Sequence, residues 1–166
     1  VDLQFIDKNI INVFEEYQMT IPSIVTASAA IVIGKRGLIS ADYSSQDFSK
    51  ARFRPAADAF FGQLNTAANS QLKTVNNLRI GGEFNLGRLA LRAGYNSSNS
   101  PFKNNNTKNI QKTFGMGFIF GSGKLDLAYS RLQQNGSFRA LDYPTAPSIG
   151  LDRDRNTLTL GYTLFL

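Results

Sequence analysis

The sequence predicts an all-β fold, a transmembrane antiparallel up-and-down β-barrel to which these 166 residues contribute about seven strands. Three observations predict this class. Strand-length segments alternate apolar and polar residues, short and long connections alternate along the chain, and the apolar rows carry no charge in their middle positions. These are the properties of a sheet that separates lipid from water.

Residues 1–20 are predicted to form a loop or a short helix that precedes the strands. Asp7 can cap such a helix, in which apolar residues recur at helical spacing. A strand over residues 1–6 is the competing prediction. The chain begins at Val1 without an initiator Met or a signal-peptide pattern, so we expect a processed protein or a fragment.

Residues 21–166 are predicted to form the C-terminal part of the barrel, and they begin with three hairpins. Each hairpin joins two segments that have one apolar and one polar face. In the third hairpin, Phe114, Met116 and Phe118 alternate with Thr and Gly. The paired segments and their tight turns are 21–33 with 38–49 around Gly34–Gly37, 75–85 with 88–96 around Asn85–Arg88, and 112–120 with 124–132 around Gly121–Lys124.

The last predicted strand, 156–166, alternates most regularly. Its apolar row consists of Leu158, Leu160, Tyr162, Leu164 and Leu166. Small residues, mostly Thr, form the opposite row. A strand of a soluble β-sandwich also hides one face, so this alternation alone leaves sandwich and barrel open.

The lengths of the connections separate these two classes. Tight turns alternate with long connections over about 50–74, 97–110 and 133–155. All tight turns therefore fall at one end of the sheet and all long connections at the other, as in outer-membrane barrels. The links of a Greek-key sandwich follow no such rule. The alternation favours the barrel.

The first long connection contains a predicted helix. Pro55 can occupy its first turn, and apolar residues then recur at helical spacing. One interpretation is a helix that covers part of a core. The other is an apolar lid or collector over a ligand entrance, with Phe60, Phe61 and Leu64 on this hydrophobic outer-loop face.

Charged residues avoid the middle of the apolar rows. A Lys or Arg at the midplane of a bilayer costs roughly 2–4 kcal/mol, so a lipid-facing wall needs this absence. Arg131 also lies on an apolar row, but it is near the end of the predicted strand 124–132. Tyr43, Tyr95 and Tyr129 lie at the loop-side ends of the apolar rows, where the aromatic girdle of a membrane barrel would lie.

The polar rows carry charges of both signs and are predicted to face the lumen. The candidate residues of this lumen-facing polar network are Asp42, Arg79, Glu83, Arg92 and Asp126. Such charges would be unfavourable in a dry core and stable in a wet or hydrogen-bonded lumen. Two roles are open, a salt-bridge network that stiffens the wall and the lining of a wet channel.

The amino-acid composition argues against several classes of function. The chain contains no Cys and no His, so it lacks thiolate metal ligands, a His general base and the usual nucleophile pairs. We therefore predict no enzyme activity, no metal site and no cofactor. The net charge of +6 comes from scattered basic residues with no run longer than Lys35-Arg36, so no nucleic-acid partner is predicted.

The predicted strand number is odd. Bacterial single-chain barrels have an even number of strands, whereas seven are predicted here. Either residues 1–20 supply a further strand, or the chain is part of a longer barrel. A self-closed barrel of seven or eight strands would leave little lumen, so the longer barrel is the better interpretation.

Several short runs follow one another in the order and spacing of one family, over about residues 20–166. They are Ile21-Pro22, Gly37–Tyr43, Arg79–Phe84, Leu91–Tyr95 with Pro101 after it, Gly115–Phe118 and Leu125–Tyr129. Together they resemble the C-terminal half of FadL/TodX-type outer-membrane transport proteins, with the Bacteroidetes branch nearest.

This resemblance implies that the chain is about half of a 14-stranded barrel in the outer membrane of a Gram-negative bacterium, with an N-terminal plug inside the complete barrel. It also implies passive uptake of hydrophobic small molecules, such as long-chain fatty acids, and their lateral release through a gap in the wall. The expected partners are outer-membrane lipid and a hydrophobic small-molecule ligand. Because the plug and the first half are missing from these residues, no substrate contact is transferred to them.

Two other functions remain open. One is a structural or accessory barrel that docks onto a larger outer-membrane assembly, with other outer-membrane proteins as partners. The other is a porin for polar solutes, which the mixed charges of the polar rows would suit.

Overall fold

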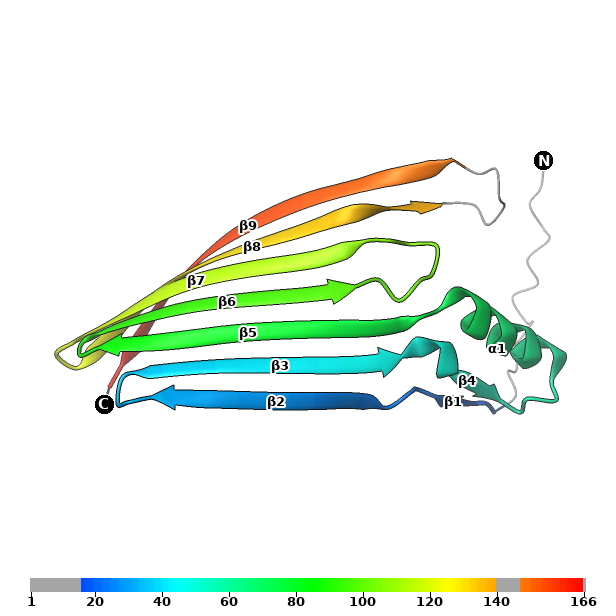
Figure 1. Ribbon diagram of the computed structural model, residues 1–166, viewed down its shortest axis with the longest axis horizontal. Coiled ribbons are helices and arrows are strands. Elements are labelled where there is room, and N and C mark those ends of the chain that lie inside the picture. The colour runs from blue at the N-terminus through cyan, green and yellow to red at the C-terminus, as the bar shows by residue number, and fades with distance from the viewer. Residues whose placement is uncertain (1–15, 140–146, 166) are drawn as a thin grey trace, which may run out of the picture.

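The computed structural model describes residues 16–139 and 147–165. One large antiparallel sheet dominates it, with a two-stranded sheet and one α-helix near one end (Figure 1). The large sheet consists of β2 (Ile24–Ile33), β3 (Gly37–Asp47), β5 (Thr74–Leu86), β6 (Leu89–Asn99), β7 (Lys108–Phe120), β8 (Gly123–Arg139) and β9 (Ser148–Leu164). The other elements are β1 (Gln18–Thr20), the 3-10 helix η1 (Phe48–Lys50), β4 (Arg52–Arg54) and α1 (Ala59–Gln71).

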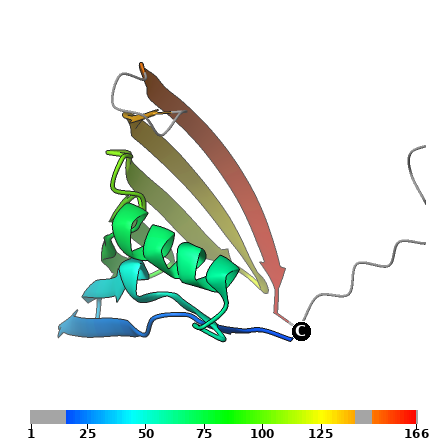
Figure 2. The ribbon, with the colours of Figure 1, turned by 90° about the vertical axis from the view of Figure 1, so that its right-hand side faces the viewer.

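The seven strands lie in the large sheet in chain order, and each neighbouring pair is antiparallel. This confirms the predicted all-β class and the up-and-down order of strands. Viewed from the helix end, the sheet is a single curved layer (Figure 2). It is open, because β2 and β9 form its edges and do not pair with each other.

The tight turns and the longer connections lie at opposite ends of the sheet, as the sequence predicts (Figure 1). Each tight turn contains one glycine with positive φ, namely Gly34 at 58°, Gly87 at 71° and Gly121 at 49°. Residues with a side chain rarely adopt this conformation. Glycine at these positions therefore allows the strands to reverse direction within a few residues.

Two predicted loops are shorter than predicted: the first at both of its ends, and the second over most of its length. The sequence predicts loops over 97–110 and 133–155, but β6, β7, β8 and β9 extend into both segments. Most residues of these extensions are polar, and on β9 the apolar Ile149 and Leu151 lie on the face opposite to the apolar row, so hydrophobic periodicity does not reveal the extensions. Side-chain amides support the pairing there, since Gln134 Nε2 donates to Asn109 Oδ1 at 2.8 Å between β8 and β7.

The predicted helix in the first long connection is present as α1. Its N-cap is Asp58, whose Oδ1 accepts from the backbone N–H groups of Phe60 at 2.8 Å and Phe61 at 3.1 Å. Strand β1 pairs with β4 next to this helix, so the end of the 1–20 segment is a strand where a loop or helix is predicted. The predicted helix around Asp7 falls outside the described residues.

The described residues enclose almost no core. Among them, Ala51 and Ala90 are the buried hydrophobic residues, and Ser100 and Thr107 are the buried polar ones. Domains normally bury the apolar face of a sheet against a second layer, and the large sheet has no such layer within the described ranges. Its function therefore depends on what covers each of its two faces.

Candidate functional site

One face of the large sheet carries a continuous apolar band. The strand register aligns its side chains into rows that cross the sheet, such as Phe84, Leu91, Met116, Leu127 and Leu160. On β7 the band runs from Phe114 to Phe120. This length corresponds to about 20 Å at roughly 3.4 Å per residue. The band is thus long enough to form a distinct apolar layer across all strands.

Between the two edge strands the apolar band is more exposed than the polar face behind it, whereas on β2 and β9 both faces are exposed. Leu160 of β9 is 69% exposed. On β6 and β7, Leu91 and Phe114 are exposed, whereas their polar neighbours Arg92 and Thr113 are half-buried. In a soluble domain the apolar face of a sheet is the covered one, and a large exposed apolar patch marks an interaction surface.

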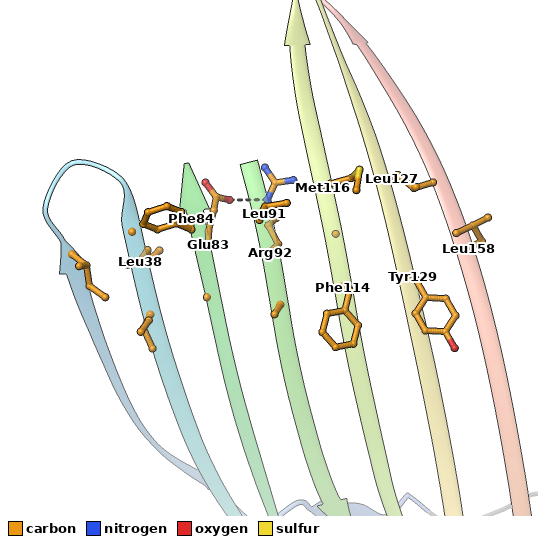
Figure 3. A pocket seen from close by; sticks show the side chains of 16 residues that line it. Leu38, Glu83, Phe84, Leu91, Arg92, Phe114, Met116, Leu127, Tyr129 and Leu158 are labelled. Atoms are coloured by element: carbon orange, nitrogen blue, oxygen red, sulfur yellow. Dashed lines mark hydrogen bonds and ion pairs between the residues drawn. The ribbon is translucent and has the colours of Figure 1, made fainter. Parts of the chain in front are cut away.

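A shallow hollow of about 650 Å³ lies on the apolar band (Figure 3). It reaches from Ile33 on β2 to Leu158 on β9. Figure 3 shows Phe114, Met116 and Tyr129 among the side chains that line it. Glu83 and Arg92 are also among the lining residues, but most of the lining is apolar, so an acyl chain or another apolar group suits its chemistry.

Tyrosines lie at the loop-side limit of the apolar band. Tyr129 pairs with Phe114 inside the band, and Tyr95 pairs with Lys112 at its edge. The Tyr129 hydroxyl donates to Asn156 Oδ1 at 2.7 Å, away from the apolar rows. An apolar ring with a polar tip suits a boundary between an apolar and an aqueous layer.

On the opposite face, three of the five predicted network residues meet, and Figure 3 shows one of their ion pairs. Arg92 Nε donates to Glu83 Oε2 at 2.7 Å, and Arg92 Nη1 donates to Asp126 Oδ1 at 2.9 Å. Lys124 Nζ lies 3.0 Å from Asp126 Oδ2, and Asn85 Nδ2 donates to Glu83 Oε1 at 2.9 Å. Every oxygen of both carboxylates is therefore engaged. We call these residues the ion network.

Arg92 reaches Asp126 across β7 because β7 has glycines on this face. Gly115 pairs with Arg92, and Gly117 pairs with Asp126. A Cβ atom at Gly117 would lie 2.5 Å from Asp126 Oδ1 and 3.3 Å from Arg92 Nη1. A Cβ atom at Gly115 would come no closer than 3.5 Å to its nearest neighbour, Leu127 O. Gly117 thus provides the space for an ion pair that spans two strand intervals.

The other two predicted network residues remain outside the ion network. Asp42 and Arg79 lie opposite each other on β3 and β5, but neither forms an ion pair with a residue that the structure describes. With its amide oriented to suit its neighbours, Asn77 accepts from Arg79 Nε and Nη2, both at 3.0 Å. A second hollow of about 340 Å³ lies next to Asp42, Ser44 and Arg79.

Sequence reasoning missed two members of the ion network, Lys124 and Asn85. Lys124 lies two residues before Asp126, and Asn85 lies two residues after Glu83. Residues two apart in a strand share a face, so this spacing could have identified both.

Phe60, Phe61 and Leu64 lie on α1 in different surroundings. The ring centroid of Phe61 lies 6.1 Å from that of Phe53 and 5.9 Å from that of Tyr17. Phe60 contacts Phe61 at 5.6 Å and is itself 63% exposed, whereas Leu64 is half-buried. We call Tyr17, Phe53, Phe60 and Phe61 the aromatic cluster, and Phe60 and Tyr17 are its exposed members.

The connection over residues 100–107 holds α1 at the loop end of the sheet. The backbone N–H of Lys103 donates to Gln71 O at 2.7 Å, and Lys103 Nζ donates to Asn69 O at 2.9 Å. A cation is favourable at the C-terminal end of a helix. Lys73 Nζ donates back to the backbone of the same connection at 3.1 Å. The helix that carries Phe60 and Phe61 is therefore held at the loop end of the sheet.

No protein-family model, curated protein or solved structure matches this chain. None of the described helices is long and apolar enough to cross a membrane. Within the described ranges, no group of three or more acidic side chains could hold a metal ion. The functional conclusions therefore rest on the two faces of the large sheet and on the aromatic cluster.

Proposed function

We propose that this chain forms about half of the wall of an outer-membrane β-barrel in a Gram-negative bacterium. In this proposal the apolar band faces lipid and the polar face lines the lumen. The complete barrel takes up hydrophobic small molecules passively and releases them laterally.

The exposed apolar band is the observation that carries this proposal. Each of the seven strands has at least two large hydrophobic side chains exposed. Covering one such side chain contributes about 1.5–3 kcal/mol, so an uncovered band of this size would be unstable in water. Lipid covers an apolar surface without the need for a partner of complementary shape. The main requirement of a lipid-facing surface is the absence of charge near the bilayer midplane, and the band has no charged residue there.

The direction of the edge strands determines how such a barrel could close. Because the seven strands alternate in direction, β2 and β9 run the same way. Closure of this sheet on itself would give a parallel seam, unlike the antiparallel seams of bacterial barrels. If a second copy of the chain lay in the same membrane orientation, its β2 would also pair in parallel with β9 of the first copy. An antiparallel seam requires an odd number of strands from a different stretch of polypeptide.

The aromatic cluster and the family resemblance support a hydrophobic cargo. Phe60 presents an accessible ring at the end of the sheet where the long connections gather. Such a ring offers an apolar contact to a molecule that enters from the loop side. The resemblance to FadL/TodX-type proteins points to the same cargo, with the long-chain fatty acid as its representative.

Membrane insertion of the full chain is the first test. The detergent-solubilised protein, mixed with phosphatidylcholine vesicles, should float with them, and external protease should cleave only at the end with the long connections. Monodisperse protein in buffer without detergent would contradict the proposal. A stable protein partner that covers the apolar band would instead support the accessory barrel.

Uptake of a fluorescent long-chain fatty acid by cells tests the cargo. We expect Phe60→Ser to reduce the initial uptake rate about fivefold, because loss of one aromatic contact removes roughly 1 kcal/mol. Phe102→Ser is the matched control, since Phe102 is also exposed in a long connection but lies outside the aromatic cluster. Equal rates for both variants would remove the aromatic cluster from the proposal.

A porin for polar solutes is the second candidate, and the loop-side half of the polar face favours it. This part carries an amide belt whose members are Asn77, Asn96, Asn109, Gln111 and Gln134. Amides and hydroxyls offer donors and acceptors to a polar solute. Stable ion conductance in a planar bilayer, without uptake of fatty acid, would favour the porin.

A further inference from the structure

We propose that Lys112 and Arg131 bind the phosphate of an anionic lipid headgroup in the loop-side leaflet of the membrane. This inference rests on the proposed membrane wall and adds a specific lipid contact to it. In an outer membrane, that leaflet consists of lipopolysaccharide, whose lipid A carries phosphate groups.

The location of the pair matches the level of a headgroup. Lys112 on β7 pairs with Arg131 on β8, on the same face as the apolar band. Phe114 and Tyr129 form the next row toward the band. Lys112 and Arg131 are therefore the first charged cross-strand pair beyond the acyl-chain layer, with Tyr95 next to Lys112 on β6.

Two like charges that face each other across a strand pair are unfavourable. Asp154 relieves part of this repulsion, because Arg131 Nε donates to both of its carboxylate oxygens at 2.9 and 3.1 Å. Arg131 Nη2 also donates to Asp154. Lys112 Nζ and Arg131 Nη1 have no partner among the residues that the structure describes. A phosphate between the two side chains could accept from both and offset the remaining repulsion.

The other charged groups on this face confine the site to β7 and β8. Lys108 lies two rows farther toward the loops, where it pairs with Asn135. Asp152 and Asp154 lie on β9 and would repel an anion there. The positive charge is thus concentrated on the β7 side of Arg131, where Lys112 lies.

Arg155 provides a matched control on the other face. It pairs with Leu132, one residue from the pairing of Arg131 with Asn156, so the two arginines lie at nearly the same height. Both are exposed. Arg155 belongs to the polar face, so a lipid headgroup outside the wall would not reach it.

The experiment measures binding of diphosphoryl lipid A and of dephosphorylated lipid A to the full chain in phosphatidylcholine vesicles. We expect Lys112→Gln to weaken binding of the diphosphoryl form about fivefold, and the double change with Arg131→Gln to weaken it about thirtyfold. Lys112→Arg should bind as the wild type does, and Arg155→Gln should change binding less than about twofold. High salt should weaken wild-type binding.

Three results would overturn this inference alone. They are equal binding of both lipid A forms, wild-type affinity in the double variant, and an effect of Arg155→Gln as large as that of Lys112→Gln. In each case the protein would still insert into the vesicles, so the membrane wall would stand. Failure of the wild-type chain to insert would overturn the wall and the headgroup site together.

Discussion

The two faces of the large sheet are held together in different ways. Within the apolar band the described contacts are between apolar side chains, such as Phe118 with Phe120 at 6.3 Å and Phe120 with Tyr162 at 6.1 Å between ring centroids. On the polar face, Arg92 joins Glu83 and Asp126 by directed ion pairs across β5, β6 and β8. Apolar contacts are non-directional, whereas ion pairs and hydrogen bonds depend on geometry.

The two faces therefore place different requirements on the sequence. A lipid-facing surface needs only to be apolar, because acyl chains adapt to its shape. The ion network needs particular residues, including a glycine at position 117 that leaves room for it. Substitutions on the apolar face should therefore act through polarity, and those on the polar face through geometry.

A positive charge in the middle of the apolar band should have the largest effect. We expect Leu160→Arg to destabilise the protein in vesicles by about 2–4 kcal/mol, since the charge would lie near the bilayer midplane. Thr159→Arg places the same charge one residue away on the polar face and should cost less than about 1 kcal/mol. Guanidinium unfolding from phosphatidylcholine vesicles measures both. Leu160 is 69% exposed, so in water its side chain could be replaced by Arg at little cost. Equal costs for Leu160→Arg and Thr159→Arg would therefore contradict a lipid-facing band.

Removal of the central cation of the ion network should have the next largest effect. Arg92→Gln leaves Glu83 and Asp126 without their shared guanidinium and should lower the free energy of unfolding by about 1–2 kcal/mol. This figure is modest because Arg92, Glu83 and Asp126 are 37%, 35% and 31% exposed, so water screens the charges. Arg79→Gln should cost about 0.5 kcal/mol, since Arg79 has no described ion pair. Similar losses in both variants would exclude a special role for the ion network.

A methyl group at Gly117 should have a smaller effect through the same network. The added Cβ atom would meet Asp126 Oδ1 at 2.5 Å, so the flexible side chains must move and the ion pair lengthens. We expect Gly117→Ala to cost about 1 kcal/mol and Gly115→Ala to be close to neutral. In an Arg92→Gln background, the cost at Gly117 should shrink, because the ion pair is already gone. An unchanged cost in that background would show that Gly117 is needed for another reason.

The strand order follows from local patterns, and this explains why the sequence predicts it well. An up-and-down sheet pairs segments that are neighbours in the chain, so alternation together with Gly34, Gly87 and Gly121 specifies most of it. The strand ends were harder to predict. On β8 and β9 the extensions pair through their backbones, but Ile149 and Leu151 lie on the face opposite to the apolar row, so the periodic signal is interrupted there.

The candidate site was predictable in part. Period-2 spacing places Glu83, Arg92 and Asp126 on one face, but it does not say which of the charged residues on that face touch. That depends on register and on side-chain direction. Arg79 turns toward Asn77 instead of Asp42, and Arg92 crosses β7 only because Gly117 has no side chain. The contacts of these side chains follow from the three-dimensional structure and not from the spacing of residues in the sequence.

A change of shape without a change of polarity should have the smallest effect. Leu158→Ile keeps the volume and apolar character of a side chain that is 70% exposed in the described sheet. In lipid we expect a change below about 0.5 kcal/mol, whereas a site packed against another protein layer would lose about 1 kcal/mol. Unfolding from vesicles again provides the measurement. Leu160→Arg distinguishes lipid from water, and Leu158→Ile distinguishes lipid from a protein cover. A large cost for both would indicate a protein layer on the apolar band, as in an accessory barrel docked onto an assembly.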